Sequence, residues 1–144
     1  MAHAALKNTS VIFAQFILGG LTYCALEILY RGYSHPSMLI AGGLCFVLLC
    51  RVAWSRLNLL QGAVIGALII TTVELAVGII VNLWLGLRVW DYSTLPLNLW
   101  GQVSLYYTLI WFALSALVIL LARIIRGSAL LYMERLREES ILYK

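Results

Sequence analysis

Two glutamates lie within stretches of this chain that are otherwise apolar enough to cross a membrane. Glu27 belongs to SVIFAQFILGGLTYCALEILY, and Glu74 belongs to GAVIGALIITTVELAVGIIVNLWLG. A charged side chain at the centre of a bilayer costs about 2.5–3.5 kcal/mol on insertion scales, so an acid there indicates a functional site. The chemistry that such an acid offers is binding of a proton, a cation or a hydrogen-bonding small molecule.

The two acids differ in the partners that their own helices offer. Glu27 precedes Arg31 by four residues, the favourable order for an ion pair along one helix face. It is therefore either a binding residue or half of a structural ion pair. Glu74 has no basic residue one turn away, so it needs a partner from another segment or stays protonated. We expect Glu74 to carry the function.

Other polar residues follow the same helical spacing. Glu74, Gly78 and Asn82 are four residues apart and share one face, and Gln102 lies at the start of the last apolar segment. Asn82 and Gln102 are either binding residues or hydrogen-bonding contacts between helices. We expect Glu74, as a protonatable acid, to form the floor of a polar cavity that opens on the outer side, with Glu27, Arg31, Asn82 and Gln102 in its walls.

Polar residues of the connections complete the expected site. His35 and Asp91 are placed at the mouth of the cavity, although His35 can equally be solvated and Asp91 can cap a turn. The acids and His35 lack a recognised ligand spacing, so no metal site is predicted, and no catalytic residue is assigned. The predicted substrate- or ion-binding set is Glu27, Arg31, His35, Glu74, Asn82, Asp91, Asn98 and Gln102.

The elements that position these residues follow from composition. The 144 residues are 63% hydrophobic with a mean hydropathy of +0.97, against roughly 45–50% apolar residues in soluble domains. The apolar runs are long and do not alternate, which favours helices over barrel strands. We predict an all-α integral membrane domain over 1–125, with transmembrane helices near 10–30, 37–56, 60–86 and 103–125.

The remaining residues, 126–144, alternate apolar and charged side chains. This pattern predicts an amphipathic cytoplasmic helix on the membrane surface or against a partner, or a solvated helical tail. A polar outer loop is expected between the third and fourth helices.

The distribution of basic residues predicts the orientation. Arg31 and Arg88 lie on one side, and the other side collects Lys7, Arg51, Arg56, Arg123, Arg126, Arg135, Arg137 and Lys144. By the positive-inside rule, both termini face the cytoplasm and the protein is integral to the cytoplasmic (plasma) membrane. The net charge of +4 is thus explained by topology, and no nucleic-acid partner is expected.

The sequence lacks the motifs of several common enzyme classes. The sequence contains no G-x-x-x-x-G-K-[ST] for ATP, no H-E-x-x-H for zinc and no G-x-S-x-G for a nucleophilic serine. Cys24, Cys45 and Cys50 fall in apolar segments without metal-binding spacing, so we expect packed thiols. No cofactor is predicted.

Two motifs carry a resemblance to a known family. They are E-x-x-x-R-G-x-x-H, from Glu27 to His35, and W-D-Y-S-x-x-P-x-N-x-x-G-Q, from Trp90 to Gln102. The stretches around them, 27–46 and 74–111, resemble the family of small membrane proteins described as "Putative ABC-transporter type IV". The first stretch is also similar to a related animal transmembrane family. The resemblance implies the eight polar residues named above as the shared set, and an ABC permease would require a separate ATPase subunit.

Taken together, the sequence predicts a small transport or substrate-binding membrane protein in which the WDYS loop acts as a lid. An intramembrane enzyme acting on a lipid or amphiphile, with Glu27, His35 or Asp91 as acid or base, is the first alternative. A structural or regulatory membrane subunit is the second. Membrane lipids, a small-molecule or ion substrate, and a second copy or partner membrane subunit are the expected partners.

Overall fold

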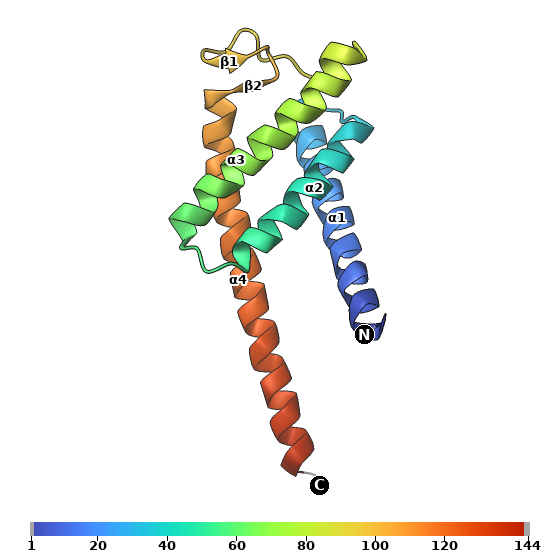
Figure 1. The fold of residues 1–144 in the computed structure, drawn as a ribbon, viewed down its shortest axis with the longest axis vertical. Helices are drawn as coiled ribbons and strands as arrows, with labels where there is room; N and C mark the ends of the chain where they lie inside the picture. Colours follow the sequence, from blue (N-terminus) through green and yellow to red (C-terminus); the bar gives the residue numbers. More distant parts are fainter. Residues whose placement is uncertain (1, 143–144) are drawn as a thin grey trace.

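The computed structural model is a bundle of four long helices with a small hairpin at one end (Figure 1). It describes the backbone of residues 2–142 and the side chains of residues 9–138. Both ends of the described chain lie at the end of the bundle away from the hairpin. The helices are α1 (Ala2–Arg31), α2 (Pro36–Ala53), α3 (Leu59–Gly78) and α4 (Leu105–Leu142).

All four helices include a segment long and apolar enough to cross a membrane. The predicted all-α class with four long apolar helices is therefore confirmed. The predicted orientation of the termini stays a prediction, and its charges at Lys7 and Lys144 lie outside the described side chains.

Local capping fixes where the helices begin. Pro36 opens α2, and the backbone N–H of Ser37 donates to the His35 ring at 3.3 Å. At the start of α3, Asn58 and Gln61 form a reciprocal capping box. These caps define the short connections that make consecutive helices antiparallel neighbours.

Glycines bring α1 and α2 into close contact. A Cβ added to Gly20 would lie 2.5 Å from the carbonyl oxygen of Leu39, and one added to Gly43 would lie 2.6 Å from that of Phe16. Because any larger side chain would collide with backbone, these positions let the helices approach closely. Both glycines belong to Gly-Gly pairs, Gly19–Gly20 in α1 and Gly42–Gly43 in α2.

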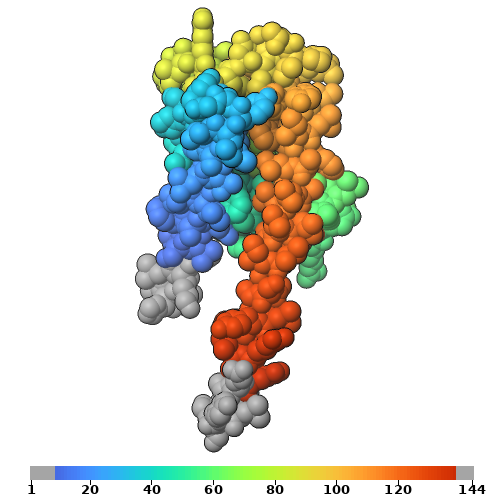
Figure 2. Space-filling view, turned by 180° about the vertical axis from the view of Figure 1, so that it is seen from behind, coloured from blue at the N-terminus to red at the C-terminus, as the bar shows by residue number. Residues whose placement is uncertain are grey.

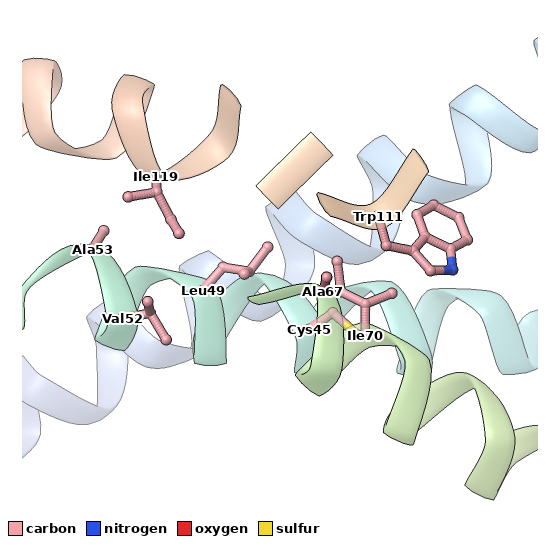
Figure 3. Close-up of a cluster of buried hydrophobic side chains, with 8 residues drawn as sticks. All are labelled: Cys45, Leu49, Val52, Ala53, Ala67, Ile70, Trp111 and Ile119. Carbon is pink, nitrogen blue, oxygen red and sulfur yellow. The ribbon is translucent and has the colours of Figure 1, made fainter. Parts of the chain in front are cut away.

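The buried core lies between α2, α3 and α4 (Figure 3). Ile119 of α4 is fully buried, and Leu49 of α2 is 3% exposed. The described part of α1 packs mainly on α2, so it forms an outer wall of the bundle rather than part of this core. This arrangement leaves α1 and α4 as neighbours across the cavity described below.

Helix α3 continues as the π-helix η1 (Ile79–Trp84), which the sequence analysis did not predict. The connection after it folds back as a hairpin of two short strands, β1 (Asn98–Leu99) and β2 (Val103–Ser104), in antiparallel register. Arg88, Leu97 and Trp100 adopt positive φ angles there. We call residues 85–104 the hairpin loop.

The last helix continues without a break into the predicted tail. Helix α4 is continuous over 38 residues, about 57 Å at 1.5 Å per residue, and projects beyond the other helices (Figure 1). The segment after Arg123 is rich in helix-forming Ala, Leu, Met, Glu and Arg and contains no proline, so Gly127 alone does not interrupt it. The predicted tail residues Tyr143 and Lys144 lie outside the described residues.

Candidate functional site: a glutamate in an aromatic cavity

Glu74 of α3 is 9% exposed and is held by two neutral donors. The indole Nε1 of Trp111, on α4, donates to its Oε2 at 2.9 Å, and the hydroxyl of Tyr92, in the hairpin loop, donates to its Oε1 at 3.0 Å. Glu74 therefore finds hydrogen-bond partners in other segments, which is one of the two alternatives that the sequence analysis left open. Arg31 pairs with Glu27 of its own helix rather than with Glu74.

The two donors differ in what they allow at Glu74. An indole N–H is only a donor, whereas a tyrosine hydroxyl can donate or accept. A carboxylate accepts from both partners. A carboxylic acid can keep the Trp111 bond on one oxygen and donate its proton to the Tyr92 hydroxyl from the other. The site is therefore chemically competent for a glutamate that gains and loses a proton.

Four rings surround this carboxyl group, and we call them the aromatic box: Tyr23, Tyr92, Tyr107 and Trp111. The Tyr92 and Tyr107 rings stack at 4.2 Å between centroids, and Trp111 lies 6.1 Å from Tyr107 and 6.2 Å from Tyr23. These spacings are within the range of favourable aromatic pairs. The box joins α1, α4 and the hairpin loop around an acid of α3.

A cavity of about 410 Å³ adjoins the box. Its lining comes from α1, α2, α3, α4 and the hairpin loop, and most of it is aliphatic or aromatic. The charged side chains in that lining are Glu27, Arg31 and Glu74. The observed cavity thus joins both intramembrane acids, but it is less polar than the sequence predicted.

Glu27 and Arg31 form the expected ion pair, with Nη2 of Arg31 donating to Oε1 of Glu27 at 2.6 Å. Ser34 donates to the other carboxylate oxygen at 2.6 Å, and Nη1 of Arg31 donates to the carbonyl of Val89 at 2.7 Å. The pair therefore connects α1 to the hairpin loop. Nε of Arg31 is buried without an acceptor among the described residues.

Asn82 and Gln102 hold the hairpin loop in place. The Asn82 amide donates to the carbonyl of Trp90 at 3.1 Å and to Oε1 of Gln102 at 2.8 Å, and it accepts from the backbone N–H of Val89 at 2.7 Å. The hydrogen bonds of both side chains hold the loop, and neither side chain lines the cavity. Their expected place in the cavity walls is therefore wrong. Their predicted part in binding stays a prediction.

The remaining predicted residues stabilise turns and also lie outside the cavity lining. The His35 ring contacts the Ser37 hydroxyl at 2.8 Å. Asp91 accepts from the backbone N–H of Ser93 at 2.8 Å, and this bond lowers the pKa of its carboxyl group below the usual range. The Asn98 amide donates to two loop carbonyls, those of Ser93 and Leu95.

Tyr92 and Trp111 are site residues that the sequence analysis did not assign. Two signals were available in the sequence. Tyr92 lies inside the WDYS motif, and Trp111 lies at helical spacing with the polar residues Ser104, Thr108 and Ser115. Burial, followed by the nearby charge of Glu74, raises the pKa of the Tyr92 hydroxyl above its usual value. Tyr92 therefore remains a neutral hydrogen-bond donor at physiological pH.

A resident metal has no evident place here. The described His, Cys, Asp and Glu side chains contain no group of three that could hold an ion together. The site is instead a hydrogen-bonded acid with an adjoining aromatic cavity.

Fold and site together define a helical membrane protein with a ligand-sized cavity at an intramembrane acid. The chain belongs to the family described as "Putative ABC-transporter type IV", which matches it over residues 21–141. The resemblance found in the two motifs is thereby confirmed, and the match extends beyond them to most of the chain. Comparisons with curated proteins and with solved structures gave no match.

Proposed function

We propose that this protein is a small transport or substrate-binding membrane protein whose cavity takes its substrate beside Glu74. Glu74 is the group that exchanges a proton for the substrate, and the hairpin loop is the lid. The observation that carries the proposal is the hydrogen bond from Tyr92 of the loop to Glu74 of α3, at 3.0 Å. Through this bond, whether Glu74 holds a proton or a substrate directly affects how firmly the hairpin loop is attached over the cavity.

The exchange follows from the hydrogen-bonding capacity of the carboxyl group. A substrate donor or cation that binds to Oε1 competes with the Tyr92 hydroxyl for the same oxygen. Loss of the Tyr92 bond weakens the attachment of the hairpin loop, which the Asn82 contacts still hold at its base. Substrate binding is thereby linked to opening of the lid. Protonation of Glu74 is linked to release of the substrate.

The orientation and the partners belong to the same proposal. With both termini in the cytoplasm, the hairpin loop faces outward and the cavity lies under the outer surface. Four helices form a narrow domain, so a second copy or a partner membrane subunit completes the pathway. If transport is driven by ATP, a separate subunit supplies the ATPase, because the sequence carries no P-loop.

The enzyme alternative has less support. A general acid or base must come within about 2.6–3.2 Å of the reacting group or act through one water. His35 and Asp91 are engaged in turns and are not part of the cavity lining, which leaves Glu27 and Glu74 as the acids that line it. Glu27 is held in its ion pair with Arg31, and the Ser34 hydroxyl that donates to it does not line the cavity.

Reconstituted vesicles containing an internal pH dye test the proposal. A panel of Na⁺, K⁺, amino acids and organic amines is added outside, and proton movement is recorded for wild type and Glu74→Gln. We expect at least one solute to move protons through wild type and not through the variant. Glu134→Gln, the same change on the part of α4 beyond the bundle, is the matched control. Equal proton movement in wild type and Glu74→Gln would contradict the role of Glu74.

A further inference from the structure

We propose that the ligand of the cavity is a hydrophobic organic cation, and that it reaches the cavity sideways from the bilayer between α1 and α4. This inference rests on the proposed function, because it names the substrate class of the same site. It follows from the charge, the aromatic lining, the size and the position of the cavity mouth.

The charge of the lining favours a cation. Arg31 and Glu27 are paired at 2.6 Å, so together they contribute no net charge. Glu74 is held only by neutral donors and, when ionised, leaves the lining with one net negative charge. The surroundings contain few polar groups, so charges attract and repel each other more strongly there than in water. A cation is therefore attracted to ionised Glu74, and an anion of the same shape is repelled.

The aromatic box supplies the second element of recognition. The faces of Tyr and Trp rings attract ammonium-type cations, by roughly 0.5–2 kcal/mol for each well-placed ring. Tyr23, Tyr92, Tyr107 and Trp111 all line the cavity and lie around the carboxyl group that provides the charge. A carboxylate among rings is suited to a quaternary or otherwise weakly hydrated cation.

The size and the aliphatic lining exclude a bare metal ion. A volume of about 410 Å³ lies in the usual range for organic ligands, roughly 300–1,000 Å³. Metal ions such as Ca²⁺ require six or more oxygen ligands, and the carboxylates that line the cavity are only Glu27 and Glu74. The ligand must therefore bring its own apolar surface to fill the space.

The mouth of the cavity faces the side of the bundle. Leu26 and Tyr30 of α1 and Tyr106 and Ile110 of α4 line the cavity and are exposed, Tyr30 at 82%. Figure 2 shows α1 (blue) and α4 (orange) side by side on this face. In a membrane, side chains of spanning helices exposed in this way contact lipid, so the opening lies beside the acyl chains. A hydrophobic cation concentrates in that region before it binds.

Binding of tetraphenylphosphonium, compared with tetraphenylborate, tests the charge and the class together. The two ions share size and shape and differ in sign. Titration calorimetry on the purified full chain should give saturable binding of tetraphenylphosphonium and at least about tenfold weaker binding of tetraphenylborate. Glu74→Gln should weaken tetraphenylphosphonium binding by about tenfold to a hundredfold, and Glu134→Gln should leave it unchanged.

Two substitutions of Tyr107 measure how much an aromatic ring contributes to the binding affinity. Tyr107→Leu removes a ring of the aromatic box and should weaken tetraphenylphosphonium binding by about 3- to 30-fold, whereas Tyr107→Phe keeps the ring and should bind nearly as wild type. A purely structural role of Tyr107 would show as lower thermal stability without this difference in affinity between the two variants. Equal affinity in both variants would contradict recognition through the ring.

The route is tested at the mouth. Ile110→Trp narrows the opening and should slow uptake and release of tetraphenylphosphonium together, leaving the ratio of the two rates nearly unchanged. A tetraphenylphosphonium-selective electrode follows both rates in proteoliposomes. Leu68→Trp, on an exposed part of α3 that does not line the cavity, is the control. Unchanged rates in Ile110→Trp would overturn the sideways route.

The outcomes separate this inference from the proposed function. If tetraphenylborate binds as well as tetraphenylphosphonium, or neither binds, the substrate class is wrong. The proposed function would still stand if another solute moved protons through wild type and not through Glu74→Gln. If tetraphenylphosphonium binds wild type and Glu74→Gln equally, both the cation site and the role of Glu74 are refuted.

Discussion

Replacing Tyr92 with Phe removes one hydroxyl from the contact between the hairpin loop and Glu74. The ring and its stacking on Tyr107, at 4.2 Å between centroids, are retained, so little packing is lost. What disappears is the donor 3.0 Å from Oε1 of Glu74. The substitution therefore measures how strongly the buried acid holds the loop.

The expected magnitude follows from the chemistry of that bond. A hydrogen bond to a charged group contributes about 1.5–3 kcal/mol, and one between neutral groups about 0.5–1.5 kcal/mol. With Glu74 ionised, we expect Tyr92→Phe to lower the free energy of unfolding by about 1.5–3 kcal/mol. In the Glu74→Gln background the same substitution should cost only about 0.5–1.5 kcal/mol, because the acceptor is then neutral.

Unfolding by SDS in mixed micelles measures these free energies for wild type, both single variants and the double variant. The resulting double-mutant cycle isolates the interaction between the two side chains. Tyr132→Phe removes a hydroxyl from the exposed part of α4 and serves as control. Additive effects of Tyr92→Phe and Glu74→Gln would refute the reasoning, because the acid and the loop would then not be coupled.

The pH dependence of the same contact has a definite sign. Burial raises the pKa of Tyr92 in the folded protein, so the unfolded chain loses this proton first as the pH rises. The stabilisation is fully present below the ordinary tyrosine value of about 10 and declines above it. Tyr92→Phe should lack that part of the alkaline decline, which unfolding measurements between pH 8 and about 11 would reveal.

Three further substitutions, with Gly127→Ala as the control for one of them, test the scaffold around the site. Asn82→Leu removes three hydrogen bonds, so the free energy of unfolding should fall by about 3 kcal/mol and amide exchange should accelerate in the hairpin loop. Gly20→Val brings a side chain against the backbone of α2 and should cost about 1–3 kcal/mol, whereas Gly127→Ala meets nothing within 4 Å and should be neutral or stabilising. Arg123→Met removes two hydrogen bonds to carbonyls at the end of α2 and the connection after it, and should lower stability by about 1–3 kcal/mol. A change below about 0.5 kcal/mol for either Asn82→Leu or Arg123→Met would contradict the role given to that contact.

The helices and the local ion pair could be predicted because their signals are short in range. The hydrophobic runs alone define four spanning segments, and the four-residue spacing of Glu27 and Arg31 places them on one helix face. The burial of Glu74 likewise follows from its position in an apolar run. None of these inferences requires knowledge of how distant segments meet.

The partners of Glu74 could not be predicted in the same way. Tyr92 and Trp111 are 18 and 37 residues away, and both reach the acid only through the folding of the hairpin loop and the packing of α4 on α3. The same loop explains why Asn82 was misplaced in the cavity wall. Its amide lies near the level of the cavity along α3 and η1. It is hydrogen-bonded to backbone groups of Val89 and Trp90, which become its neighbours only when the loop folds back.

The ends of helices were also predicted less well than their apolar centres. The charged residues after Arg123 mark the end of an apolar segment. An apolar segment and the helix that contains it can end at different residues. A helix can continue past an apolar segment where its residues favour it, and α4 does so to Leu142. The π-helix left no recognised trace in the sequence because it replaces one regular helical pattern by another.

The continuity of α4 makes it a lever. Tyr107 and Trp111, at one end of this helix, form part of the wall that a ligand would touch, and the other end projects beyond the bundle. From Trp111 to Leu142 the helix spans about 47 Å, so a tilt of about 10° at the cavity would displace its tip by about 8 Å. A small rearrangement around Glu74 would thus be magnified at the far end, where another molecule can sense it without reaching the cavity.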